Sequence, residues 1–99
     1  MRILALSHDA PDADWNGRDE VLREEAQKIW DLHKSGALRE IWVTVPERNA
    51  VLMLECESVA DASRIVSDLP LVRAQLIAFT LMQLGPYDGF GRLFAHQYT

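Results

Sequence analysis

The chain has 99 residues, a formal net charge of −5 and a pI of about 5.0. A single domain of this length buries about 60–70% of the surface of its unfolded chain, so it needs neither a disulfide nor a structural metal to fold. The acidic balance argues against nucleic acid and against an anionic membrane, because both require a basic face. We therefore expect a small-molecule substrate or another protein as the partner.

The single cysteine and the first residues indicate the compartment. Cys56 cannot form an internal disulfide, and it lies in an apolar stretch where a free thiol is usually a small buried hydrophobe. The apolar run Met1–Leu6 is cut off by His8 and Asp9, well short of a signal-peptide core, and no run approaches the ~18 apolar residues of a membrane span. These features predict a cytoplasmic protein.

The first third of the chain predicts a strand, a loop and a helix. Arg2–Ser7 is typical of a strand. His8–Gly17 has the Pro, Asp, Asn and Gly of a loop, and we interpret its Trp15 as a cover over the core or a hydrophobic staple. Asn16 is the expected N-cap of a helix that ends at Gly36. The apolar stripe of this helix comprises Leu22, Ala26, Ile29, Trp30 and His33.

The middle of the chain predicts a hairpin followed by a second helix. Leu38–Val45 alternates and is rich in β-branched residues, and Pro46–Asn49 forms a tight connection to a third strand, Ala50–Glu57. Ser58 and Asp61 then make a capping box, in which each side chain bonds a backbone N–H that the first helical turn leaves unpaired. A helix should therefore begin directly after the third strand.

Pro70 is expected to end that helix, because it lacks an N–H donor and restricts the residue before it. Apolar residues at helical spacing precede it, namely Ala62, Ile65, Val66 and Leu69. Val72–Leu84 is a long β-rich run for which helix is the rival reading; we take a strand, because Pro70 prevents the helix from continuing. The predicted order is β-α-β-β-α-β.

This order predicts an α+β fold, the ferredoxin-like sandwich, in which one antiparallel sheet carries both helices on one face. Strand parity leaves Trp42, Val51 and Met53 on the uncovered face, with Leu76 and Met82 from the last strand. This apolar patch is too large for a soluble monomer. We expect a homodimer or higher homo-oligomer in which two sheets close into a dimeric α+β barrel.

The remaining segment of this single domain, Gly85–Thr99, is rich in glycine and aromatic residues. We expect Tyr87, Phe90, Leu93 and Phe94 to pack on the barrel or on a neighbouring subunit. Its GFGRLF run is not a dinucleotide fingerprint, because no helix is expected after it. It is also not the aromatic RNA-binding motif, which belongs on the third strand of a basic protein.

Glu55 is the candidate catalytic residue. By parity it lies on the uncovered face, in the middle of an apolar strand, and a carboxylate with little water around it has a raised pKa that suits general acid or base catalysis. The alternative is an ordinary ion pair with Arg39, Arg48 or Arg73, or a position at the strand end that reaches water.

The candidate substrate-binding residues surround Glu55 in this interpretation. Trp42 offers a flat wall to a ring, although a tryptophan in a dimer core is also common. Ser7 and Thr80 are candidate hydrogen-bond donors to a carbonyl, or satisfied core hydroxyls. The remaining candidates on this face are Glu40, Thr44 and Met53.

A metal site is not predicted. His8, His33 and His96 are widely separated and show no metal-ligand spacing. We predict no metal and no cofactor.

Several short runs resemble the muconolactone isomerase family. They are Glu57-Ser58, Asp68-Leu69-Pro70-Leu71, and the following strand through Ile77 and Thr80, with Arg39 and Trp42 at matching places. The similarity covers Leu38 to Met82. It implies a ferredoxin-like α+β barrel, larger than a dimer in the classical enzyme, that shifts a double bond in a small unsaturated lactone by proton abstraction and return without a cofactor. An acidic residue is usual at the position of Glu55.

The chain also departs from the family pattern. Leu76-Ile77-Ala78 stands where Asp-Ile-Glu is expected, and Ser63 replaces a helical histidine. The tail Gly85–Phe94 differs as well and is closer to uncharacterised relatives. The fold therefore transfers better than the substrate.

Three functions remain open at the level of sequence. The first is a cofactor-free isomerase-like enzyme that acts by proton transfer on a small unsaturated lactone or cyclic carbonyl compound. The second is a non-catalytic barrel that binds a small ligand or serves in assembly. The third is a cofactor-free oxygenase or cyclase acting on an aromatic substrate.

Overall fold

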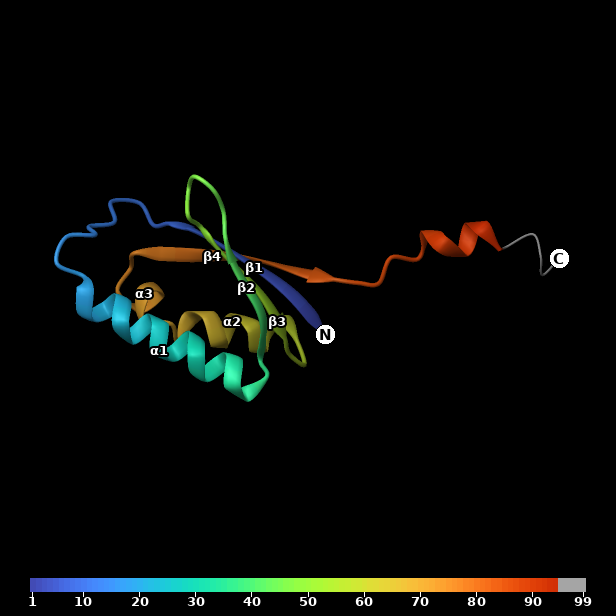
Figure 1. The fold of residues 1–99 in the computed structure, drawn as a ribbon, viewed down its shortest axis with the longest axis horizontal. Coiled ribbons are helices and arrows are strands. Elements are labelled where there is room, and N and C mark those ends of the chain that lie inside the picture. The colour runs from blue at the N-terminus through green and yellow to red at the C-terminus, as the bar shows by residue number, and fades with distance from the viewer. Residues whose placement is uncertain (95–99) are drawn as a thin grey trace.

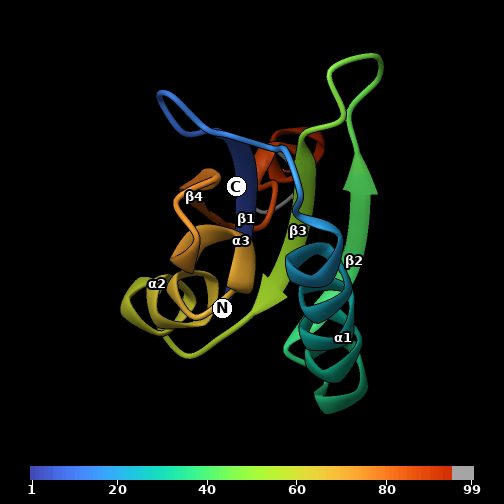
Figure 2. The same cartoon turned by 90° about the vertical axis from the view of Figure 1, so that its left-hand side faces the viewer.

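A computed structural model describes residues 1–94 as a four-stranded antiparallel sheet with helices packed on one face (Figure 1, Figure 2). The strand order is β2-β3-β1-β4, so the first strand lies inside the sheet. This topology confirms the predicted ferredoxin-like α+β class. The elements are β1 (Arg2–Asp9), α1 (Asp19–Ser35), β2 (Leu38–Val43), β3 (Ala50–Glu55), α2 (Val59–Ser67), α3 (Pro70–Arg73), β4 (Ile77–Leu84) and the 3₁₀ helix η1 (Gly89–Leu93).

Helix α1 ends as predicted and begins later than predicted. Gly36 terminates it in the left-handed conformation, with φ 89°, which glycine adopts without a Cβ penalty. Asn16 is not its N-cap, because Gly17, at φ 67°, separates Asn16 from the helix. The Asn16 N–H instead bonds Asp14 Oδ1 at 3.0 Å within the β1–α1 loop. Arg18 holds the N-cap position without a side-chain hydrogen bond.

Helix α2 begins with the Ser58 half of the predicted capping box, whereas the Asp61 carboxylate pairs with Arg64 in the next turn. Ser58 is extended, and its Oγ accepts a hydrogen bond from the Asp61 N–H at 3.1 Å. Pro70 does not simply end this helix. It opens the separate helix α3, where a missing N–H and a fixed φ are compatible with the first helical position.

The predicted start of the last strand at Val72 is wrong. Val72 belongs to α3, and β4 begins only at Ile77. Between them Gln75 has φ 62°, and the Leu76 N–H bonds the Leu71 carbonyl at 3.0 Å, which closes a turn. Leu76 is therefore buried in a small cluster with Leu71 and Ile77, and its predicted place on the uncovered face is also wrong.

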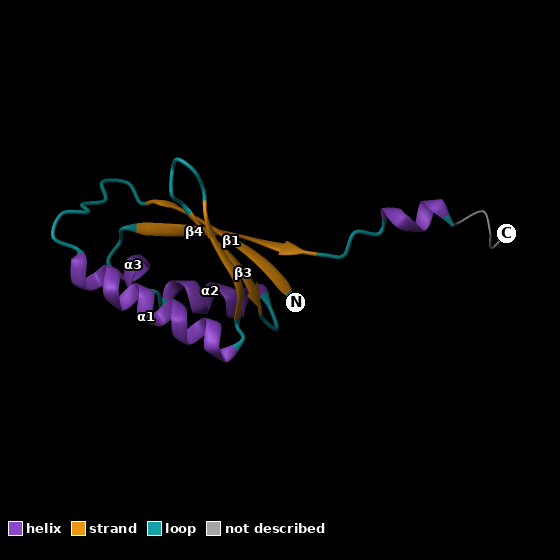
Figure 3. Ribbon diagram, in the orientation of Figure 1, coloured by secondary structure: helices purple, strands orange, loops and turns teal. Residues whose placement is uncertain are grey.

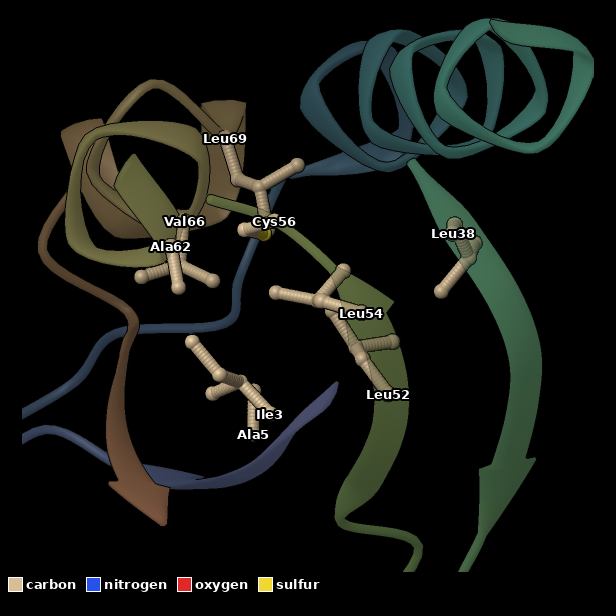
Figure 4. Close-up of a cluster of buried hydrophobic side chains, with 9 residues drawn as sticks. All are labelled: Ile3, Ala5, Leu38, Leu52, Leu54, Cys56, Ala62, Val66 and Leu69. Carbon is tan, nitrogen blue, oxygen red and sulfur yellow. The ribbon is translucent and has the colours of Figure 1, made fainter. Parts of the chain in front are cut away.

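The main core lies between the sheet and the helices α1 and α2 (Figure 4). It comprises Ile3, Ala5, Leu38, Leu52, Leu54, Cys56, Ala62, Val66 and Leu69. Each fully buried leucine contributes about 1.5–3 kcal/mol of hydrophobic stabilisation relative to an exposed one. The Cys56 thiol is buried, as predicted, and burial raises its pKa.

The other face of the sheet is uncovered in the single chain. A register shift in β2 between Leu38 and Glu40 allows Leu38 to face the core while Glu40 and Trp42 lie on the uncovered face. There Trp42 pairs with Val51 and Glu40 with Met53, as the predicted alternation requires. Trp42 is 64% exposed. We call this surface, formed by Leu4, Leu6, Glu40, Trp42, Val51, Met53, Glu55, Thr80, Met82 and Leu84, the open face.

After Leu84 the chain leaves the body as a projecting arm, and the described molecule measures 65 × 28 × 20 Å (Figure 1, Figure 3). Tyr87 is 71% and Phe90 66% exposed, and their rings pack edge to face with centroids 5.0 Å apart. GFGRL forms η1 itself, although no helix was expected there. Gly85 and Pro86 lie next to Arg2 and Glu55 of the sheet, and the chain then projects away from it (Figure 1). Packing of this segment on a neighbouring subunit stays a prediction. Residues 95–99, with His96, lie outside the described part.

No helix within residues 1–94 combines the length and the apolar character needed to cross a membrane.

Candidate active site between α1 and the sheet

A cavity of about 720 Å³ lies on the helix-covered side of the sheet. Its walls come from one side of α1, the strands β1 to β4, and the β2–β3 hairpin loop. The apolar wall residues include Leu22, Ile29, Ile41, Val43, Leu52 and Phe79. Its volume falls within the range of small-molecule sites, roughly 300–1,000 Å³.

Glu25 is the carboxylate that α1 presents to this cavity. Its Oε1 accepts a hydrogen bond from the Leu71 N–H at 3.0 Å, which fixes the side chain between α1 and α3. Burial raises the pKa of Glu25 because the ionised form loses water, and the Leu71 hydrogen bond only partly opposes this effect. A carboxyl group with a raised pKa in an apolar cavity is suited to accept and return a proton.

The raised pKa of Glu25 predicts a loss of stability with rising pH. Between the ordinary value of 4.5 and the raised value, the folded chain keeps a proton that the unfolded chain has released. The free energy of unfolding therefore falls as the pH rises through this window and is constant above it. In Glu25→Gln the part of this pH dependence that comes from Glu25 should disappear. Urea denaturation at several pH values between 4 and 7 would measure the free energy of unfolding of both proteins.

The control for this measurement is Glu24→Gln, on the exposed side of the same helix turn. It should follow the wild-type pH dependence. Parallel curves for Glu25→Gln and the wild type would contradict the assignment.

Ser7 supplies a hydroxyl to the same cavity. Only 4% of this residue is exposed, and its Oγ accepts a hydrogen bond from the Ala50 N–H at 2.7 Å. Accepting that bond leaves the hydroxyl proton free to donate to a ligand. The sequence predicted Ser7 as a carbonyl donor, but on the face between two sheets; the structure places it on the opposite side, with Glu25.

The mouth of the cavity is formed by two loops. Trp15, from the β1–α1 loop, is 39% exposed and faces the cavity. The hairpin loop contributes Glu47, Arg48 and Asn49. Thr44 stabilises this hairpin loop, because its Oγ1 accepts the Asn49 N–H at 2.9 Å. Because β2 ends at Val43, Thr44 lies in the loop and not in the predicted strand; its place on the open face stays a prediction.

Glu55 lies on the open face, as predicted, but its electrostatic environment is the reverse of the one expected. The N-terminal ammonium lies 3.1 Å from Glu55 Oε2, and its hydrogen bond lowers the pKa of this carboxyl group. A lowered pKa makes a carboxylate a weaker base. The expected raised pKa is wrong, and so is the expected position in the middle of the strand, because Glu55 is the last residue of β3. The catalytic role of Glu55 stays a prediction.

The other sequence candidates share the open face with Glu55. Trp42 Nε1 donates to Glu40 Oε1 at 3.3 Å, and Met53 and Thr80 lie on neighbouring strands. The structure thus separates the predicted site residues into three groups. Ser7 lines the cavity, Thr44 forms a hydrogen bond within the hairpin loop, and the others lie together on the open face. Among residues 1–94, no group of three or more His, Cys, Asp or Glu side chains is arranged to hold a metal ion.

Sequence reasoning missed Glu25, although the helical spacing contained a signal. Glu25 falls between Leu22 and Ile29 on the apolar stripe of α1, where a carboxylate cannot remain fully solvated. A charged residue on the buried side of a helix is a functional candidate for this reason.

Solved structures share this fold. One neighbour is 5-chloro-2-hydroxyhydroquinone dehydrochlorinase from Burkholderia phenoliruptrix AC1100, in complex with 2,5-dihydroxybenzoquinone; it has a TM-score of 0.71 and 16% identity, over 90% of this chain and 98% of that one. Another is muconolactone isomerase, with a TM-score of 0.70 and 16% identity, over 89% of this chain and 92% of that one. No protein-family model and no curated protein sequence matches the chain.

These comparisons define the class of the fold. The chain has the ferredoxin-like α+β architecture, and the particular version of it is the one found in muconolactone isomerase. The resemblance predicted from the sequence is thereby confirmed for the fold.

Proposed function

We propose that this protein is a cofactor-free enzyme that moves a proton on a small cyclic carbonyl compound, within the cavity between α1 and the sheet. One observation carries the proposal: a carboxyl group with a raised pKa, Glu25, and a buried hydroxyl, Ser7, line the same apolar cavity. The neighbours' names support the class of substrate, since one is an isomerase of a lactone and the other was solved with a quinone.

In the proposed reaction Glu25 acts as base and then as acid. Its carboxylate removes a proton from a carbon next to the carbonyl, and the C–H electron pair shifts to give an enolate. The Ser7 hydroxyl donates a hydrogen bond to the enolate oxygen. Glu25 then returns the proton to a different carbon, so that the double bond moves and no atom is gained or lost.

Proton exchange with solvent tests this proposal directly. The protein is incubated in D₂O with a panel of unsaturated γ-lactones and cyclic enones, without added cofactor, and deuterium is followed by NMR and mass spectrometry. Deuterium should enter the carbon next to the carbonyl faster than in buffer or with heat-unfolded protein. Exchange at the buffer rate across the whole panel would contradict the proposed function.

A homodimer formed through the open face is the proposed assembly. The exposed apolar side chains Trp42, Met82 and Leu84 lie on this one surface. An apolar sheet face this large is normally shielded from water by another element or another subunit. The arm from Gly85 to Phe94 would then pack on a neighbouring subunit. The cytoplasmic location and the two other functions considered from the sequence stay predictions.

A further inference from the structure

The charged groups around the cavity are mostly acidic. Asp9 lies on the same side of β1 as Ser7, Glu25 comes from α1, and Glu47 comes from the hairpin loop. Among the described residues that line the cavity, Arg48 is the one cation, and it is adjacent to Glu47 in the loop. The cavity therefore has an excess of negative charge, in a chain whose net charge is also negative.

The strands that line the cavity offer an anion only hydrogen bonding, and the one cation among the described lining residues, Arg48, comes from the hairpin loop next to Glu47. Ser7 contributes one hydroxyl, and the surrounding walls are aliphatic or aromatic, as with Ile41, Val43 and Phe79. A buried anion without a cationic partner loses its water at a high cost in free energy. A ligand carboxylate would in addition be repelled by Asp9 and Glu47.

The aromatic walls and the single hydroxyl of the cavity fit an uncharged ring instead. The flat indole of Trp15 and the ring of Phe79 offer apolar surface to a planar ligand. The Ser7 hydroxyl needs only a neutral oxygen as its acceptor.

We propose that the ligand of this cavity is an uncharged, planar, unsaturated ring compound with a carbonyl oxygen, and that the cavity discriminates against the same ring carrying a carboxylate. This inference rests on the proposed function for the location of the site, and it adds the charge of the substrate. It does not require that the bound compound is turned over.

A matched pair of ligands tests the inference. One is an unsaturated γ-lactone with a methyl substituent, and the other is the same lactone with a carboxymethyl group in its place. Isothermal titration calorimetry at pH 7.5 and low salt should give a dissociation constant at least about tenfold lower for the methyl lactone. The difference should narrow at high salt, because mobile ions screen the repulsion at the exposed mouth.

Variants at the mouth identify the source of the discrimination. Glu47→Gln, on the exposed hairpin loop, should narrow the difference between the two ligands several-fold. Glu57→Gln is the matched control, because this exposed glutamate does not line the cavity and should leave the difference unchanged. Quenching of tryptophan fluorescence by the methyl lactone should be reduced in Trp15→Phe, which places the ligand in this cavity.

The outcomes separate this inference from the proposed reaction. Preferential binding of the methyl lactone without any deuterium exchange would support the inference and contradict the reaction. Equal affinities, tighter binding of the carboxymethyl lactone that is lost in Arg48→Gln, or no saturable binding of either ligand would overturn the inference.

Discussion

Glu25→Gln is expected to slow deuterium exchange into the substrate by about 10²–10⁴-fold, the usual contribution of a positioned general base. Glutamine has almost the same size, and its side-chain oxygen can still accept the Leu71 N–H that Glu25 Oε1 accepts at 3.0 Å. The substitution therefore removes the proton acceptor and keeps the packing of α1 against α3. The rate is measured by NMR under single-turnover and steady-state conditions, after circular dichroism has confirmed the fold.

Glu55→Gln is the matched counterpart, because it removes the carboxylate that strand parity selected. It lies on the open face, beside the N-terminal ammonium, so it should leave the exchange rate within about twofold of the wild type. Loss of exchange in Glu55→Gln together with normal exchange in Glu25→Gln would contradict the role of Glu25. It would instead place the reaction at Glu55, between the sheets of two subunits.

Trp42→Ala is expected to raise the dissociation constant of the dimer by about 30-fold or more, equivalent to about 2 kcal/mol for a tryptophan that is buried in an interface. The side chain is 64% exposed in the single chain and pairs across the sheet with Val51. Burial against a second copy removes this apolar surface from water. Sedimentation velocity over a concentration series measures the change.

Trp30→Ala provides the control for the dimer experiment. Trp30 is also exposed, at 55%, but it belongs to α1 on the other side of the sheet, where its ring lies beside that of His33. Its removal should leave the dissociation constant unchanged. A wild-type protein that is monomeric at micromolar concentration, or a Trp42→Ala variant that associates like the wild type, would contradict the open face as the interface.

The sequence predicted those parts of the fold that depend on local physics. The Ser58 cap and the Gly36 terminus involve neighbours in the chain, and both are present in the structure. The Asn16 cap and the Val72 start of the last strand failed for a related reason. Gly17, at positive φ, separates Asn16 from α1, and Pro70 opens the further helix α3, which gives way to β4 only after the positive φ of Gln75. Hydrophobic periodicity registers neither change.

The site was predicted less well because its properties arise from contacts between distant residues. Parity correctly placed Trp42 and Glu55 on the open face, since alternation along a strand is local. The pKa of Glu55, however, is controlled by the N-terminus, which is brought close when the Cys56 N–H bonds the Met1 carbonyl at 2.9 Å. The environment of Glu25 likewise depends on Leu71, which is 46 positions away.

The alternation of side chains along β1 has a practical consequence. Ser7 points to the cavity, whereas Leu6 and His8, its immediate neighbours, point to the other side of the sheet. Residues for binding a small molecule and residues for binding another subunit thus alternate along one strand. Directed evolution can consequently retune either property by changing every second residue, while the intervening positions preserve the other.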